Sequence, residues 1–561
     1  MRILIQGGRI IDPSRDAHAV EDLLIDDDRI GDAKSATADS VDHVIDASGC
    51  VVMAGAIDIH THIGGGKLSI ARMLLSDTMA EEATRLGRGI DESSFLPSTE
   101  VTARRYLEMG YTVAFEPAVI PCNARAAHSE MADLPGLATG GFCLLGNDDL
   151  LLRLIAEDAE QVKINQYVAW MVRATQCIAV KVVNAGGISA FKFGVRRLDV
   201  NTPHPEYGVT PGQVIRRLAR AVHEIGLVHP LHVHCSNLGI PGNIESTLAT
   251  IEAAGGYRLH LTHAQFHSYG KSEKLGMSSA AERLARAINA NPNVTIDVGQ
   301  VLFGQTVTIS ADAAHQFQNR NYATPKKSAL VDIECEAGCG VVPFKYRRKQ
   351  FVNALQWAIG LELFLMIENP AQVFLTTDHP NGAPFTAYPH LIRLLTDRSF
   401  RETALAEIHV DAAASSSLGG MDRQYTLEEI AVMTRSAPAR IMGLSDRGIL
   451  AKGSRADVVV YPENSDHEAM FRKPRHVFAD GRWVIRDGKY DRATARATPS
   501  ITLTADIDYD TSYESEFRDR YADNASFAMN RLRIGQDEME SLIGTRPVRQ
   551  ANGPAALRGD S

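Results

Sequence analysis

The sequence lacks several features that would define other classes of protein. No run of apolar residues approaches the ~20 residues that a membrane span requires. Residues 1–8 have a short strand pattern without the regions of a secretory signal, so we expect no export signal there. The net charge of −10 argues against non-specific nucleic-acid binding. The composition is that of an ordinary globular protein without a membrane or nucleic-acid partner.

Cysteine is scarce, and the spacing of the cysteines does not indicate a disulfide framework. Seven cysteines, an odd number spread over 561 residues, are typical of reduced thiols. Cys335 and Cys339 are close together, but no second pair completes a zinc ribbon, so we interpret them as structural. The cysteine content of the chain therefore predicts a cytoplasmic protein.

Nucleotide motifs are absent and lysine is rare. Neither GxGxxG nor GxxxxGK(S/T) follows any predicted strand, so a nucleotide-binding fold has no support. Only 14 of the 58 basic residues are lysines, which makes a lysine inside an apolar run conspicuous.

The two ends of the chain share a pattern of short strands and turns. This pattern fills residues 1–55 and returns at 441–490, where 476–488 has the pattern of a hairpin. We therefore predict a small β-sandwich domain built from both termini. The polar residues 491–561 form a predicted C-terminal extension, and 546–561 are expected to be disordered or to bind a partner.

Between these ends, apolar strand-like runs alternate with helical stretches. The runs include residues 112–115, 177–183, 231–234, 259–262, 294–298 and 373–377, and the helical stretches include 211–225, 244–254, 278–289 and 348–367. Continuous apolar strands that alternate with helices indicate a parallel α/β sheet covered on both faces. The number of units predicts a (β/α)8 TIM-like barrel over residues 56–440.

Polar residues end several of these runs, and the C-terminal strand ends of a barrel form its functional face. On a strand, residues i and i+2 share a face, so His60 and His62 aim two imidazoles at one point. Each such residue alone has an ordinary explanation, such as a hydrogen-bonded histidine, but the series as a whole does not. In chain order it is His60, His62, Lys181, His232 or His234, His263 and Asp378.

The chemistry of this series points to two metal ions. Four neutral imidazoles and one carboxylate suit divalent ions such as zinc. A lysine ammonium would repel the ions, whereas a carbamate formed from Lys181 and CO₂ is a carboxylate that can bridge them. Two metals ~3.5–4 Å apart can share a hydroxide and polarise a carbonyl. Asp378 can accept the proton of that water and pass it to a leaving amine. The predicted reaction is hydrolysis of an amide-type carbonyl.

This series resembles the amidohydrolase superfamily, and several segments resemble one branch of it. Those segments are residues 58–65 (DIHTHIGG), 181–187 (KVVNAGG), 234–243 (HCSNLGIPGN), 297–300 (DVGQ) and 376–385 (TTDHPNGAPF). They look like the A subunit of formylmethanofuran dehydrogenases and the alpha subunit of the bacterial formyltransferase/hydrolase complex. The resemblance extends from residue 1 to about residue 490.

The resemblance implies a dinuclear zinc site with an N6-carboxylated lysine. Carried over to this chain, one metal would be bound by His60 and His62, the second by His234 and His263, with Lys181 as the bridge and Asp378 as the catalytic residue. The implied reaction converts formylmethanofuran and water to formate and methanofuran, within a complex of several subunits.

Several alternatives stay open at this point. His232 competes with His234 because both face the same side, and Lys192 competes with Lys181. The bacterial hydrolase complex is favoured over the archaeal dehydrogenase complex only by the excess of arginine. A hydantoinase or dihydroorotase-like enzyme uses the same ligand types, although the HPNG stretch and the long segment before Asp378 argue against it. A non-catalytic scaffold is the remaining class.

A basic run at residues 345–349 is the densest in this acidic chain. Methanofuran carries an acidic, glutamate-rich tail. We therefore predict that Lys345, Arg347 and Arg348 contact that tail or a partner subunit. The alternative is a solvated helix start.

Overall fold

The structure is a computed structural model of the 561-residue chain. It describes all residues except 16–18, 90–91, 93–94, 334–337, 497, 499, 504–506, 508, 523–531, 544–547 and 550–561. Cys335 and most of the predicted disordered tail therefore lie outside the described residues. In the part that is described, no helix has the length and apolar character needed to cross a membrane.

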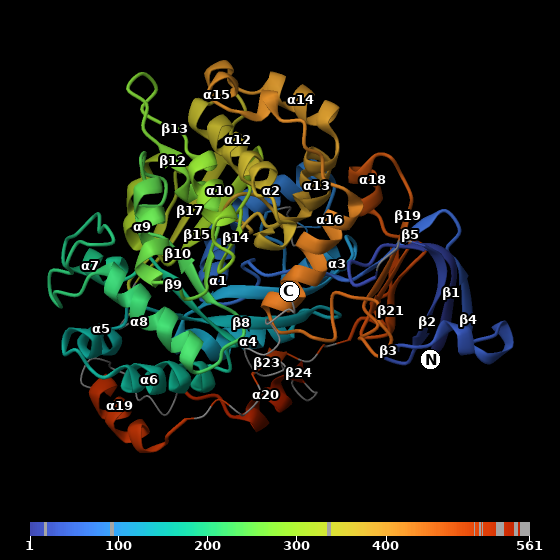
Figure 1. Ribbon diagram of the computed structural model, residues 1–561, viewed down its shortest axis with the longest axis horizontal. Helices are drawn as coiled ribbons and strands as arrows, with labels where there is room; N and C mark the ends of the chain where they lie inside the picture. The colour runs from blue at the N-terminus through green and yellow to red at the C-terminus, as the bar shows by residue number, and fades with distance from the viewer. Residues whose placement is uncertain are drawn as a thin grey trace.

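Eight parallel strands of the described chain form the central sheet (Figure 1). Their spatial order is β18-β14-β11-β10-β9-β8-β7-β6. They are β6 Ala56–Asp58, β7 Tyr111–Val119, β8 Ala138–Leu145, β9 Ala179–Val183, β10 Leu231–His234, β11 Leu259–Leu261, β14 Val294–Asp297 and β18 Val373–Phe374. Just beyond the first and last strands, Thr61 bridges His379, and the His62 N–H donates to the His379 carbonyl at 2.8 Å. The predicted (β/α)8 barrel is confirmed.

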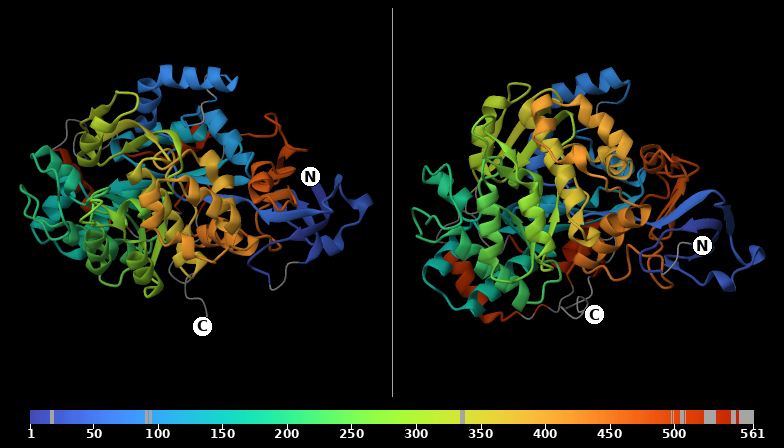
Figure 2. Two further views of the ribbon diagram at one scale, coloured as in Figure 1. Left: turned by 90° about the horizontal axis from the view of Figure 1, so that it is seen from above. Right: turned by 45° about the horizontal axis from the view of Figure 1, so that its top comes forward.

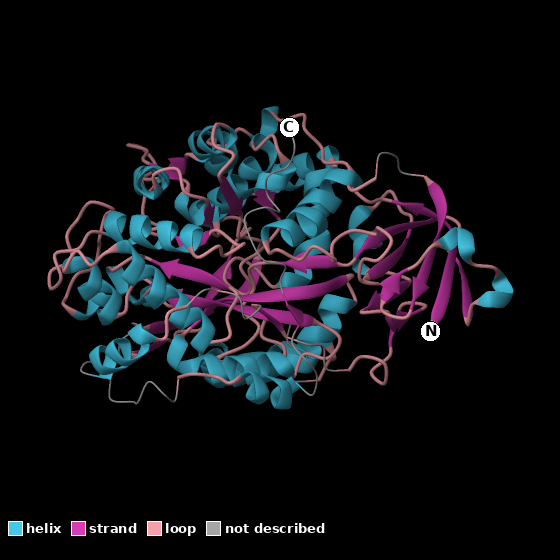
Figure 3. Ribbon diagram, turned by 60° about the horizontal axis from the view of Figure 1, so that its bottom comes forward, coloured by secondary structure: helices cyan, strands magenta, loops and turns pink. Residues whose placement is uncertain are grey.

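Helices surround this central sheet (Figure 3). They include α1 Gly66–Leu74, α2 Ser76–Leu86, α4 Ala124–Ala132, α5 Asp149–Ala156, α6 Gln161–Ala174, α7 Gly187–Lys192, α8 Pro211–Glu224, α9 Ile244–Ala254, α10 Ala281–Asn289, α12 Phe351–Met366 and α13 Tyr388–Thr396. Local signals explain α8: the Thr210 side chain accepts from the Gln213 N–H, and Pro211 opens the first turn. Its buried face includes Val214 and Leu218, as an amphipathic helix over a sheet requires.

Strand β8 is absent from the predicted runs because two glycines interrupt its apolar pattern. A Cβ on Gly140 would lie 2.9 Å from the Ile501 carbonyl oxygen, and one on Gly141 would lie 2.6 Å from Val119 Cγ2. The glycines therefore admit close neighbours, including the C-terminal strand β23 Ile501–Thr502.

Both ends of the chain share a second sheet beside the barrel (Figure 2). Its order is β22-β21-β20-β19-β5-β1-β2-β3, with β4 also paired to β1. The bounds are β1 Arg2–Ile10, β2 Val20–Asp26, β3 Arg29–Ile30, β4 His43–Asp46, β5 Cys50–Ala54, β19 Val458–Pro462, β20 His476–Ala479, β21 Arg482–Arg486 and β22 Lys489–Tyr490. The predicted sheet domain from both termini is confirmed, and its strands belong to one hydrogen-bonded sheet instead of two.

The described residues after 490 pack on the barrel. Helix α19 Ser512–Ala522 lies against α5 and α6, and α20 Gln536–Ile543 lies against α4 (Figure 1). Phe517 and Met539 are fully buried, and the Ile534 N–H donates to the Ala174 carbonyl at 2.8 Å. This part of the polar extension thus contributes apolar side chains to the core.

Candidate metal centre

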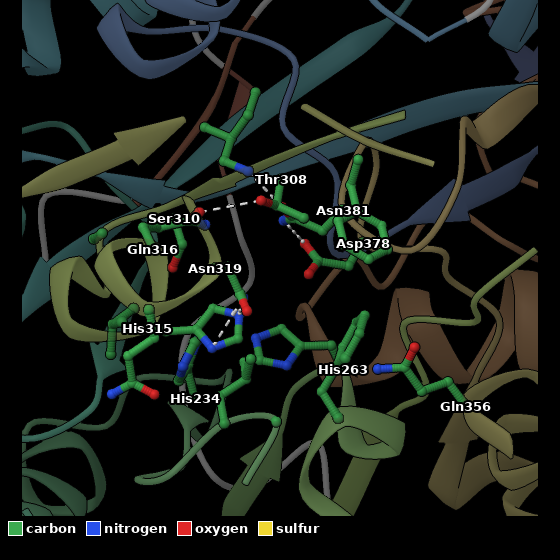
Figure 4. Close-up of a pocket in the computed structure, with 18 of the residues that line it drawn as sticks. His234, His263, Thr308, Ser310, His315, Gln316, Asn319, Gln356, Asp378 and Asn381 are labelled. Atoms are coloured by element: carbon green, nitrogen blue, oxygen red, sulfur yellow. Dashed lines mark hydrogen bonds between the residues drawn. The ribbon is translucent and has the colours of Figure 1, made fainter. Parts of the chain in front are cut away.

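A cavity of about 330 Å³ lies at the C-terminal ends of the barrel strands. All six predicted ligands line it: His60, His62, Lys181, His234, His263 and Asp378. Figure 4 shows the imidazoles of His234 and His263 and the carboxylate of Asp378 around this space. The structure brings the predicted set together because parallel strands of a barrel end at one rim.

His60 and His62 both approach Asp378. Their Nε2 atoms lie 3.1 Å and 3.5 Å from the same Asp378 Oδ1. On the other side of each ring, His60 Nδ1 lies 3.1 Å from Asp297 Oδ2, and His62 Nδ1 lies 2.8 Å from Glu116 Oε1. Each imidazole thus has a carboxylate behind it, which is how metal-binding histidines are commonly oriented.

Glu116 and Asp297 are ionised despite their burial. Burial alone would raise the pKa of Glu116, but the facing His62 and Lys67 bring it to about 2. Burial would likewise raise the pKa of Asp297, but His60 and His260 hold it well below its usual range. Two fixed negative charges therefore lie directly behind the first histidine pair.

Lys181 is fully enclosed at the centre of the site. It lies on β9, beside His232 of β10, and its side chain is buried. Burial lowers the pKa of Lys181 to about 7, against the opposing attraction of Asp297 and Asp378. Much of the amine is therefore neutral near pH 7, and this is the form that reacts with CO₂. Lys192 is absent from the cavity and pairs at 2.9 Å with the exposed Asp332.

His234 and His263 form the other side of the group. Their ring centroids are 4.6 Å apart, and Asp312 Oδ2 lies 3.4 Å from His234 Nε2. His232 lies deeper in the barrel, where its Nε2 is 2.9 Å from His60 Nδ1 and its Nδ1 is 3.0 Å from His229 Nε2. Because only His234 lines the cavity, the geometry favours it over His232.

The donor set fits a metal ion. The ligand atoms of His60, His263 and Asp378 lie within 4.8 Å of one another. Buried His263 Nδ1 has no hydrogen-bond partner in the described structure, and an unpaired buried polar atom is costly unless a ligand meets it. Burial also lowers the pKa of His234 and of His263, so both rings are neutral.

The backbone at these strand ends is strained. His263 has φ 36° and Asp378 has φ 51°. Gly299 lies against His263, and a Cβ there would be 2.3 Å from His263 Cβ. Such strained conformations tend to cluster at functional sites.

The outer wall of the cavity comes from an insertion between β14 and β18. It contains β15 Gly304–Ser310, α11 Ala313–Asn319, β16 Ala329–Val331 and β17 Cys339–Tyr346, with strand order β15-β17-β16. Thr308, Gln316, Asn319, Phe344 and Tyr346 from this insertion line the cavity. The long segment between His263 and Asp378 therefore forms part of the site.

The basic side chains of residues 345–349 lie beside the cavity and do not line it. Lys345, Arg347 and Arg348 are exposed. Lys345 lies between Phe344 and Tyr346 on β17, and it lines a neighbouring surface hollow together with Arg348. Arg348 also pairs with Glu407. Their contact with an acidic tail stays a prediction.

Four residues of this site have no role among those predicted from the sequence. Glu116, Asp297 and His267 are buried around the predicted ligands, and Asn381 lines the cavity. Asp297 accepts from the His263 N–H and the Thr376 hydroxyl, both at 2.8 Å. Asp297 lies at the end of an apolar run, so the expectation that polar residues at strand ends are functional also applies to it.

Known proteins match this chain over most of its length. The amidohydrolase family model matches residues 43–489. The A subunit of the formyltransferase/hydrolase complex Fhc of Methylorubrum extorquens is 43% identical over 92% of this chain and 94% of the relative. Protein FwdA of Methanocaldococcus jannaschii is 37% identical over 87% of this chain and 88% of the relative.

A solved structure agrees with these relatives. The crystal structure of the formyltransferase/hydrolase complex from Methylorubrum extorquens with methylofuran contains a chain that matches with a TM-score of 0.91 at 41% identity. The match covers 98% of this chain and 100% of that one. The present chain therefore belongs to the amidohydrolase family, in the branch that contains the Fhc A subunit of the formyltransferase/hydrolase complex.

Proposed function

We propose that this chain is the hydrolase subunit of a formyltransferase/hydrolase complex. It cleaves the N-formyl group of a formylmethanofuran-type carrier and releases formate and the free amine, in one-carbon metabolism of the cytoplasm. The observation that carries the proposal is the convergence of six predicted residues on one cavity, in a chain 43% identical to the Fhc A subunit. The buried thiols Cys50, Cys177, Cys235 and Cys339 agree with a reducing compartment.

The proposed cofactors are two zinc ions. His60, His62 and Asp378 would hold one, His234 and His263 the other, and a carboxylated Lys181 would bridge them. When bound, such ions polarise a carbonyl and lower the pKa of water. The carbamate forms when the neutral Lys181 Nζ attacks CO₂ and loses a proton. The low pKa of about 7 supports this step.

Asp378 is the proposed proton carrier. It takes a proton from the attacking water and delivers it to the amide nitrogen as the C–N bond breaks. The Asn381 amide donates to its Oδ1 at 3.0 Å, which fixes the carboxylate toward the cavity. The hydroxyl from the water stays on the formyl carbon, which leaves as formate. The protonated nitrogen leaves as the free amine, so both products are accounted for.

The walls of the cavity suit the head of such a carrier. Phe266, Phe344 and Tyr346 offer apolar surface, and Gln316 and Asn319 offer hydrogen bonds. Lys345, Arg347 and Arg348 are proposed to meet the acidic tail outside the cavity.

We also propose the division into a terminal sheet domain (1–55 and 441–490), a barrel (56–440) and an extension (491–561).

The test is formate release from N-formylmethanofuran by the zinc-loaded protein. We expect turnover by the parent and a loss of 10²–10⁴-fold in kcat for Asp378→Asn. Hydrolysis of cyclic ureides without formate release would favour a hydantoinase-like enzyme. Less than one equivalent of metal and no turnover of either substrate would favour a scaffold.

A further inference from the structure

His267 is a buried imidazole for which the proposed reaction has no role. It ends the short 3-10 helix η5 Ala264–His267, four residues after His263. Its side chain is 1% exposed, and neither ring nitrogen has a hydrogen-bond partner among the described residues. A neutral imidazole carries one donor and one acceptor. Leaving both unpaired in the interior is unfavourable unless a ligand meets one of them.

The ring lies against the second histidine pair. Its centroid is 5.2 Å from the ring of His234 and 5.2 Å from the ring of His263. One ligand nitrogen from each of these three rings lies within 4.8 Å of the other two. Three imidazole nitrogens that converge in this way are a donor set found in zinc sites.

The backbone of η5 is anchored, so this convergence does not depend on a loose turn. The Thr247 hydroxyl donates to the His267 carbonyl at 2.8 Å, and the Asn243 amide donates to the Phe266 carbonyl at 2.8 Å. His315, another imidazole that lines the cavity, differs because its ring has a partner. His315 Nε2 lies 2.6 Å from Asn319 Nδ2.

We propose that His267 is a third imidazole ligand of the metal position shared by His234 and His263. The inference rests on the proposed metal-dependent function and extends it. One position then has three neutral imidazoles, whereas the other has two imidazoles and the Asp378 carboxylate. The two positions consequently differ in charge and in affinity for zinc.

The test compares zinc binding by the full-length parent with that of His267→Leu and His267→Gln. Zn²⁺ is titrated in competition with a chelator, so the readout does not depend on activity. We expect two zinc ions in the parent. In each variant one ion should bind as before and the other at least ~10-fold more weakly. His315→Gln, which removes another imidazole near the cavity, should keep both affinities.

Two controls separate ligation from folding. Unfolding temperatures of the metal-free variants should match that of the metal-free parent, and a structure of the zinc-loaded parent should have a His267 nitrogen about 2.0–2.1 Å from zinc. Unchanged affinities in both variants would overturn the inference, as would a water between His267 and the metal. If the parent binds no zinc, the proposed function fails as well; two zinc ions that are unaffected by both variants refute only the role of His267.

Discussion

The Asn381 side-chain amide donates a 3.0 Å hydrogen bond to Oδ1 of Asp378. The carbonyl of the same amide accepts the Ile309 N–H of β15 at 2.6 Å. One side chain therefore connects the carboxylate at the end of the barrel with the insertion that forms the outer wall. We infer that Asn381 orients the proposed proton carrier.

Replacing Asn381 with Ala should lower kcat by about 10–100-fold, because hydrogen bonds to charged groups contribute about 1.5–3 kcal/mol. Steady-state formate release measures this effect, and KM should change less than kcat. Asn319→Ala removes an amide of the same cavity that contacts His315, so its effect should be confined to KM. An unchanged kcat in Asn381→Ala would show that Asp378 needs no such support.

Lys181→Ala should abolish both metal binding and turnover, because no carbamate can form. Metal analysis together with formate release measures both properties. Lys192→Ala is the matched control, since Lys192 pairs with the exposed Asp332 away from the cavity, and it should keep two metals and full activity. Two metals and full activity in Lys181→Ala would contradict the central assignment.

Glu116→Gln should weaken zinc binding at the position of His60 and His62 by about 10–100-fold, as loss of a carboxylate behind a ligating imidazole commonly does. Glu116 also accepts the Ile63 N–H at 2.9 Å, so replacing Glu116 also loosens the loop that follows His62. Glu130→Gln controls for this second effect, because Glu130 accepts from the nearby Gly65 N–H. Equal zinc affinities in the two variants would argue against a specific role for Glu116.

Asp148 should make the stability of the fold depend on pH. Burial raises its pKa from 3.8 to about 6, so the folded protein holds this proton more tightly than the unfolded chain does. Below pH 4 this proton contributes its full share to the free energy of unfolding, about 3 kcal/mol at most. The contribution is lost as the pH rises through 6.

Asp148→Asn imitates the protonated form, and its carbonyl can still accept from the Leu151 N–H and the Tyr167 hydroxyl. The unfolding temperature of this variant, relative to the parent, should therefore increase between pH 4 and pH 7. A difference in unfolding temperature that is constant over this range would contradict the prediction.

The residues around the cavity were predictable where they end strands. His60, Lys181 and Asp378 each follow or interrupt an apolar run, and a parallel barrel brings all such ends to one rim. Helix α9 Ile244–Ala254 matched its predicted bounds because Gly255 ends it in the left-handed conformation. The sheet built from both termini was predictable because its strands have turn residues between them.

Only the tertiary structure distinguished His234 from His232. Both point to the same face of β10, so periodicity treats them alike, and their depth along the barrel decides which one meets the cavity. The partners of the site were also hidden from sequence: Glu116 is 54 residues from His62, and Asn381 is 72 residues from Ile309. Such contacts depend on barrel closure and strand register. The sequence alone therefore determined which strand-end side chains are candidates for the rim, and the packed fold decided which of them reach the cavity and which face one another.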